Sequence, residues 1–203
     1  MMRTRKEELA NPLQWLLRLA RLDLAVLAEV SAQPAATLPC LATVVVASFL
    51  CGLGSWLFWA FQMEGQRVQV LVRTLVMGSL LQVGAWSLWV YLTYQVLTLG
   101  YGTTVPFYGL ARAMGLAFAP MALTVLMALA PLAIPLAVIP LAATVLLSQE
   151  AIEAVSGAGK ARSLVANVVG FSGFALTLGI LANVAEVGGI GGAAPGLFFF
   201  ALD

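Results

Sequence analysis

Long apolar stretches alternate with short polar ones along this chain, and the length of the apolar stretches is its most informative feature. A helix of about 20 apolar residues crosses the roughly 30 Å of hydrocarbon in a bilayer. Five stretches come close to that length, at residues 37–62, 70–99 (or 73–99), 113–130, 132–148 and 163–185. The pattern predicts an all-α integral membrane protein with five transmembrane helices.

Residues 12–31, ahead of the first predicted span, have the pattern of one amphipathic helix. Leucines gather on one face, and Gln14, Arg18, Arg21 and Glu29 fall on a narrow opposing arc. A helix of this kind lies in the membrane interface. The alternative is that the segment simply packs on the bundle.

Three side chains of this predicted helix are candidates for contact with lipid head groups. Trp15 suits the level of the interface, and Arg18 and Arg21 are placed to meet anionic lipid from the cytoplasmic side. Asp23 projects near the apolar face, where an unpaired carboxylate is unfavourable. We therefore expect Asp23 to have a partner.

Composition supports the membrane assignment, since 62% of the residues are hydrophobic and only 9% are charged. This is too little polar surface to coat a water-soluble domain. The net charge of +1 gives no basic stripe for nucleic acid. We therefore divide the chain into a cytoplasmic N-terminal segment (1–36), a five-helix membrane domain (37–186) and a Gly-rich non-cytoplasmic tail (187–203).

Basic residues predict the orientation, because positively charged loops are retained in the cytoplasm. One predicted side has only Arg67 and Arg73. The other side collects the remaining basic residues, which are Arg3, Arg5, Lys6, Arg18, Arg21, Arg112, Lys160 and Arg162. The N-terminus is therefore expected in the cytoplasm and the C-terminus on the opposite side. Arg112, Lys160 and Arg162 become further candidates for contact with lipid at the interface.

Small residues in the first and fifth spans predict close helix packing. Gly52 and Gly54 lie in the first span, and Gly170 and Gly173 in the fifth. Glycines at such positions let a neighbouring helix approach closely.

Three amides within the spans need hydrogen-bond partners: Gln82, Gln95 and Asn167. Side chains of this type commonly join one membrane helix to another. The alternative is that the three amides line a path for a polar solute.

Reactive chemistry is sparse in this sequence. Histidine is absent, which removes the common zinc and haem ligand and the usual proton shuttle. Cys40 and Cys51 are 11 positions apart on one predicted helix. That spacing separates their Cα atoms by roughly 16 Å, too far for a disulfide. We expect no catalytic centre, metal site or cofactor.

Several segments together resemble the Yip (Ypt-interacting protein) membrane domain family, particularly its bacterial members. The resemblance covers about residues 19–179 and is carried by LARLDLAVLAEVSAQPAAT, GLG at 52–54, WSLWVYLTY, RAMGLAFAP and QEAIEAVSGAGKARSLV. It departs at Ala25, where the family has proline, and in a proline-rich fourth span. Membership implies a five-helix fold with a cytoplasmic N-terminal segment. Eukaryotic members associate with small GTPases and shape trafficking membranes, whereas the bacterial members have no established common activity.

These observations favour a non-enzymatic scaffold or accessory subunit in the bacterial cytoplasmic (inner) membrane. Its expected partners are other integral membrane proteins, in a hetero-complex, and membrane lipids. The alternative is a small-solute transporter or channel with its path near Gln82, Gln95 and Asn167. An intramembrane enzyme is a third hypothesis, which the scarcity of reactive side chains disfavours.

Overall fold

The computed structural model describes residues 12–62 and 71–184, and helices make up most of that part of the chain. Five helices in it are long and apolar enough to cross a membrane. They are Pro34–Phe58, Leu75–Gly100, Phe107–Ala128, Ala133–Ser156 and Lys160–Leu181. The prediction of a five-span, all-α membrane protein is confirmed for the described residues.

The spans are built from several helical elements. The first is α3 (Thr37–Gln62), preceded by a 3-10 turn η1 (Pro34–Ala36). The second joins a π-helix η2 (Val72–Gly78), α5 (Ser79–Gln95) and a second π-helix η3 (Val96–Gly100). The third is α6 (Phe107–Ala117) continued by a 3-10 helix η4 (Ala119–Ala128), and a 3-10 turn η5 (Ala130–Leu132) follows. The fourth and fifth are α7 (Ala133–Ser156) and α8 (Lys160–Val184).

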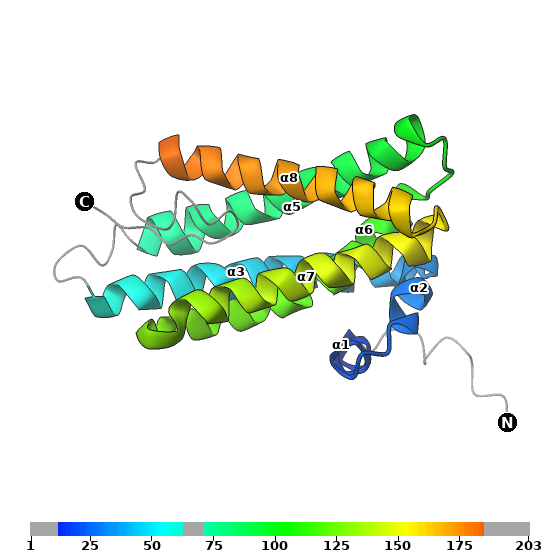
Figure 1. The fold of residues 1–203 in the computed structure, drawn as a ribbon. Helices are drawn as coiled ribbons and strands as arrows, with labels where there is room; N and C mark the ends of the chain where they lie inside the picture. Colours follow the sequence, from blue (N-terminus) through cyan, green and yellow to red (C-terminus); the bar gives the residue numbers. More distant parts are fainter. Residues whose placement is uncertain (1–11, 63–70, 185–203) are drawn as a thin grey trace, which may run out of the picture.

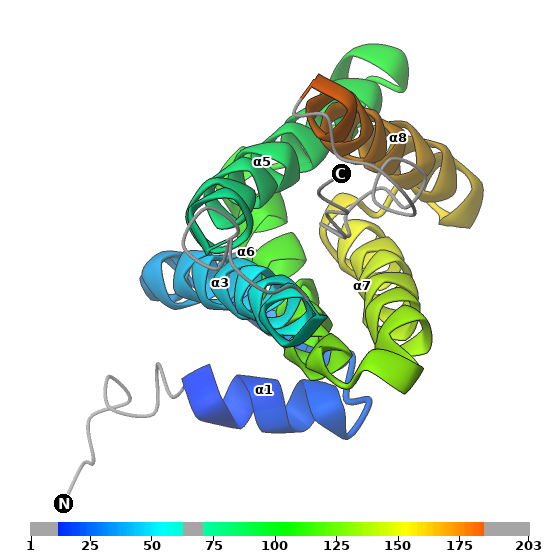
Figure 2. The same ribbon diagram turned by 90° about the vertical axis from the view of Figure 1, so that its left-hand side faces the viewer.

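The spans run lengthwise beside one another in Figure 1, and the end-on view of Figure 2 shows them as a closed ring of neighbours rather than a flat layer. In the ring α3 packs on η4, η4 on α7, α7 on α8, α8 on α5, and α5 on α3. Figure 2 looks along the spans and shows α1 (Pro12–Ala20) lying across them instead of parallel to them. The short helix α2 (Ala25–Ala32) joins α1 to the first span and packs on α6.

The N-terminal segment is two helices, so the expectation of one continuous helix over 12–31 is wrong. The chain leaves the helix after Ala20, and Leu22 adopts a left-handed backbone with φ of +62°. A leucine at positive φ is uncommon because its Cβ crowds the backbone. The break lets α1 lie across the bundle while α2 buries Val26, Leu27 and Val30 completely.

Two span boundaries also differ from the expectation. The third span begins at Phe107, inside the expected 100–112 loop, so Arg112 lies within the helix and not at its edge. The fourth span continues through the expected polar loop to Ser156 and ends at Gly157, whose φ of +58° suits glycine. Both differences arise because polar residues do not end a helix. They only mark where it leaves hydrocarbon.

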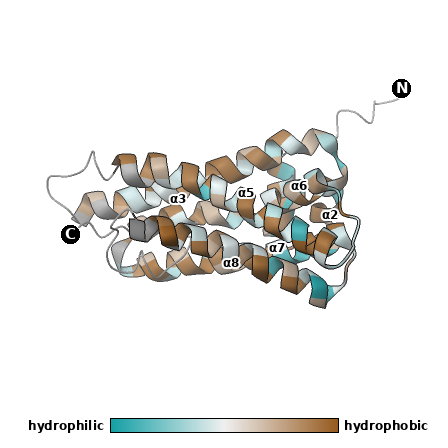
Figure 3. Cartoon of the chain, turned by 90° about the horizontal axis from the view of Figure 1, so that it is seen from above, coloured by the Kyte–Doolittle hydropathy of each residue, from teal (hydrophilic) through white to brown (hydrophobic). Residues whose placement is uncertain are grey.

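Side-chain exposure agrees with a bilayer environment. Large aromatics such as Trp89, Phe118 and Phe174 are fully buried in the ring. Many outward apolar side chains are more than half exposed, including Leu80 at 68% and Ile139 at 65%. Figure 3 shows hydrophobic residues along the length of the helices, with hydrophilic residues mainly toward the end that holds α2 and the start of α8. Lipid chains, which match these outward side chains, are their natural solvent.

Candidate functional site

An apolar groove of about 470 Å³ lies between α1 and the first span. Ten residues from three elements line it. These are Pro12 and Leu16 of α1, Leu38, Pro39, Ala42, Thr43, Val46 and Ala47 of α3, and Ala119 and Ala122 of η4. Thr43 has the only side-chain hydroxyl in this lining, and that hydroxyl donates to the Pro39 carbonyl at 3.0 Å. The groove therefore offers a ligand an almost entirely apolar wall.

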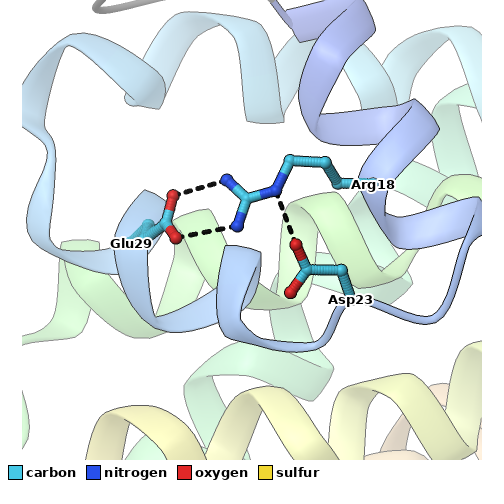
Figure 4. Close-up of polar contacts among 3 residues, drawn as sticks. All are labelled: Arg18, Asp23 and Glu29. Carbon is cyan, nitrogen blue, oxygen red and sulfur yellow. Dashed lines mark hydrogen bonds and ion pairs between the residues drawn. The ribbon is translucent and has the colours of Figure 1, made fainter.

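A charged cluster holds α1 against α2 and so fixes one wall of the groove (Figure 4). The Nε of Arg18 donates to Asp23 at 2.7 Å, and its two terminal nitrogens donate to the two carboxylate oxygens of Glu29 at 2.6 and 2.8 Å. A two-pronged contact of this kind fixes geometry as well as charge. The expectation that Asp23 has a partner is confirmed.

The same cluster sets the ionisation of its members. Hydrogen bonds from Arg18 lower the pKa of the Glu29 carboxyl below its ordinary value. In return, the hydrogen bonds to Glu29, and then those to Asp23, raise the pKa of the Arg18 guanidinium. All three side chains are about one-third to one-half exposed, so the cluster is partly open to its surroundings.

Arg112 joins α2 to two spans. From α6 its Nε donates to the Ser31 carbonyl at 3.1 Å, a terminal nitrogen donates to the same oxygen, and the other terminal nitrogen donates to the Thr37 hydroxyl at 3.2 Å. Ser31 lies in the last turn of α2, where carbonyl groups lack helical partners and the helix dipole favours a cation. The charge of Arg112 thus anchors α2 above the first and third spans.

The structure distributes the predicted interface residues among different environments. Trp15 is 7% exposed and packs on the protein, and Arg18 is paired with carboxylates. Arg112 is half-buried within the third span. Arg21 and Lys160 are exposed, and Arg162, also exposed, lies over the Tyr101 ring at 5.7 Å. Of the six, Arg21, Lys160 and Arg162 present the freest charge to the surroundings.

The leucines of α1 form an exposed surface that complements this charge. Leu13 and Leu17 are 62% and 50% exposed, and Leu22 after the helix is 76% exposed. Exposed leucines beside a salt-bridged cluster are typical of a helix that rests in the interface.

Three of the four predicted packing glycines sit at close helix contacts. A Cβ on Gly54 would lie 2.6 Å from the Thr124 carbonyl oxygen of η4 and 2.8 Å from the Val125 Cα. A Cβ on Gly170 would lie 2.8 Å from the Trp89 carbonyl oxygen and would also strike the Thr93 hydroxyl. A Cβ on Gly173 would meet the end of the Leu92 side chain, which is more yielding than backbone.

Gly52 is buried as well. The sequence analysis missed Gly115, where a Cβ would lie 3.0 Å from the Cys40 carbonyl oxygen. Its RAMGLA context contains the small residues that signal such a contact.

The three amides considered for a polar path lie in different surroundings. Asn167 is buried and bonded at both ends of its amide, because its Oδ1 accepts from the Trp89 indole at 3.2 Å and its Nδ2 donates to the Val145 carbonyl at 3.1 Å. Gln95 is half-buried at the end of α5. Gln82 lies 13 residues from Gln95 on the same span, about 20 Å along the helix.

Gln82 stands apart from the other two amides. It is fully buried, and neither its Nε2 nor its Oε1 has a hydrogen-bond partner among the described residues. The hydroxyls of Ser48 and Ser55, three residues before and four after Cys51 on α3, are also buried and unpartnered within that part of the chain. The Cys51 thiol lies beside Gln82 and Thr124. The core between α3, α5 and η4 thus carries more polarity than its helix packing requires.

No metal site is formed by the described parts of the chain, residues 12–62 and 71–184, since three His, Cys, Asp or Glu side chains nowhere come together there. Cys40 and Cys51 are both buried free thiols. The predicted tail at 187–203 lies outside the described residues. Comparison with protein-family models, with curated proteins and with solved structures finds no match to this chain.

Proposed function

We propose that the protein is a non-enzymatic scaffold or accessory subunit that binds partner membrane helices and lipid. The observation that carries this proposal is the apolar groove between α1 and α3, whose outer wall is held in place by the Arg18 cluster. A groove of this kind, at the level where a helix lies across the spans, suits a partner's transmembrane helix.

The proposal includes a bacterial inner-membrane location, a cytoplasmic N-terminus and membership of the Yip family. The end of the bundle where α8 begins also holds α2 (Figure 1). Lys160 and Arg162 lie in the first turn of α8 and Arg112 is bonded to α2, so this end would face the cytoplasm by the charge rule. The five-span domain behind an N-terminal segment supports family membership. Small GTPase binding is not part of the proposal, since that property belongs to the eukaryotic members.

The experiment that tests the scaffold role compares two substitutions of exposed alanines. Ala42→Trp fills the groove, whereas Ala142→Trp places the same side chain on the exposed face of α7. Each protein is purified from its native membrane in mild detergent, and the mass of the intact assembly is measured by native mass spectrometry. We expect a defined hetero-complex with the unsubstituted protein and with Ala142→Trp, and its loss with Ala42→Trp. A protein that runs alone at every expression level contradicts the proposal.

A small-solute transporter is the second candidate, and the unpartnered amide of Gln82 is the observation in its favour. It is less well supported than the scaffold role because Asn167 is occupied by helix-to-helix bonds. Neither the groove beside α1 nor a smaller cavity between α3, α5 and α6 is lined by Gln82, Gln95 or Asn167. Solute flux into liposomes that falls when all three are substituted would favour transport over the scaffold role.

A further inference from the structure

A second cavity, of about 230 Å³, lies between α3, α5 and α6. Its lining comprises Thr37 and Leu41 of α3, Trp86, Ser87 and Val90 of α5, and Phe107, Tyr108, Ala111 and Arg112 of α6. Unlike the groove beside α1, it combines an apolar wall with a cationic side chain. Leu41, Phe107 and Tyr108 are 40%, 38% and 69% exposed, so the cavity reaches the surface of the bundle.

Arg112 supplies this cavity with a positive charge that no carboxylate neutralises within residues 12–62 and 71–184. The ion pairs in that part of the chain both belong to Arg18. The bonds of Arg112 go to a carbonyl and a hydroxyl, which are neutral acceptors. A guanidinium has five N–H donors, and three are used, so two remain for a ligand. A charge within a membrane span is costly unless an anion or water meets it.

The cavity holds a cation at one level and is mainly apolar at the next, where the Ser87 hydroxyl is bonded to the Val83 carbonyl and the Trp86 indole N–H has no partner among the described residues. Arg112 and Thr37 are joined by a hydrogen bond and mark the polar level. Leu41 lies four residues further along α3, about 6 Å deeper in the bundle. On α5, Trp86 lies four residues before Val90. The Trp86 side chain is 4% exposed, so only a small part of its ring is accessible. This order matches a molecule with an anionic head and an alkyl chain.

The volume of the cavity limits the size of the molecule that can bind in it. At about 30 Å³ for each water-sized group, the cavity has room for about seven or eight such groups. This accommodates part of a phosphate together with the first part of one chain, while the rest of a lipid would lie outside along the exposed side chains.

We propose that this cavity binds an anionic phospholipid, with a phosphate oxygen on the free N–H groups of Arg112 and the start of one acyl chain against Leu41 and Trp86. The inference rests on the lipid-binding part of the proposed function and names the lipid class. Guanidinium and phosphate form charge-assisted hydrogen bonds with matched geometry. A zwitterionic lipid also carries a phosphate, but its own ammonium competes for it, so net negative charge is favoured.

The test uses the full-length protein in detergent and phosphatidylglycerol with brominated acyl chains, which quench nearby tryptophans. We expect a saturable fraction of the fluorescence to be quenched, and that fraction to be lost in Trp86→Phe. Brominated phosphatidylcholine should need about ten-fold more lipid for the same quenching. Equal quenching by the two lipids would overturn the requirement for an anion.

Two substitutions locate the site. Arg112→Gln should weaken phosphatidylglycerol binding at least about ten-fold. Because this change also removes the anchor of α2, a second variant, Ala111→Phe, fills the cavity and leaves the Arg112 bonds in place. It should abolish the saturable quenching. Unchanged quenching in Ala111→Phe would overturn the location.

Inorganic phosphate separates a lipid head group from a free anion. We expect phosphate without a chain to leave the quenching unchanged at millimolar concentration, and displacement of the lipid by phosphate would overturn the identification of a lipid. Ala42→Leu, which narrows the other groove without adding a tryptophan to the quenching assay, should leave phosphatidylglycerol binding intact. If the protein binds phosphatidylglycerol in this cavity but has no protein partner, only the scaffold role is contradicted. If it binds its partner but shows no saturable quenching, only the lipid site is contradicted.

Discussion

The indole Nε1 of Trp89 lies 3.2 Å from the side-chain oxygen of Asn167 and donates a hydrogen bond to it, across 78 positions of sequence. The Asn167 amide nitrogen donates a second hydrogen bond, to the Val145 carbonyl. One side chain therefore links α5, α7 and α8 inside the bundle. The Trp89 ring also packs on Phe171 and Phe174, with centroids 5.2 and 5.5 Å away, so polar and aromatic contacts fix the same register.

Replacing Asn167 with leucine should destabilise the bundle. The substitution leaves the Trp89 N–H and one lone pair of the Val145 carbonyl without partners in a buried site. Loss of such hydrogen bonds lowers the free energy of unfolding by about 1–2 kcal/mol, and the effect lies toward the lower end of that range inside membranes. The free energy of unfolding, measured by titration with SDS in mixed micelles, should fall by that amount. Ser172→Leu, at an exposed position of the same helix, is the control and should change it little.

Adding one methyl group at Gly54 should separate the first and third spans. The new Cβ would meet the backbone of η4, which cannot yield as a side chain can. Overpacking of this kind costs about 1–3 kcal/mol. Gly84→Ala is the matched control, because a Cβ there meets nothing within 4 Å. A midpoint of thermal unfolding that falls equally in Gly54→Ala and Gly84→Ala would contradict the close approach.

Acid should release α1 from α2. Arg18 lowers the pKa of Glu29 in the folded protein, so the stabilisation is complete above the ordinary glutamate pKa of about 4.3 and is lost as pH falls through the lowered pKa. A spin label on α1 at Leu17→Cys, in a background without Cys40 and Cys51, should stay restrained down to about pH 4.3 and become more mobile as the pH falls below that value, through the lowered pKa of Glu29. Glu29→Gln should make the label mobile already at neutral pH. A label that stays equally restrained from neutral pH to the acid side of the lowered pKa would show that the Arg18 cluster does not hold α1.

Labelling should place the two ends of the bundle on opposite sides of the membrane. In the same cysteine-free background, Lys160→Cys lies at the end rich in basic residues, and Leu129→Cys, 56% exposed in the native structure, lies at the other end. A membrane-impermeant thiol reagent should reach Leu129→Cys in intact cells and Lys160→Cys only after the membrane is opened. The reverse pattern would invert the proposed orientation.

Some of the candidate site could be anticipated from the sequence. The small residues around Gly54 and Gly170 indicated close packing, and the structure finds a close backbone neighbour at each. The charge pattern drew attention to Arg18 and Arg112, but it gave no indication that Arg18 is held by Glu29 or Arg112 by Ser31. These pairings depend on the break at Leu22, which folds α2 back over α6.

The sequence by itself determined that residues 12–62 and 71–184 contain five helices long and apolar enough to cross a membrane, because transfer of apolar side chains into hydrocarbon is a local, additive quantity that any window of about 20 residues reports. Only the tertiary structure decided which amides have hydrogen-bond partners, which acceptors Arg112 donates to and where cavities remain. Those outcomes depend on the rotation and axial register of each helix against its neighbours. A shift of one residue turns a helix face by about 100°, and hydropathy summed along the chain does not record it.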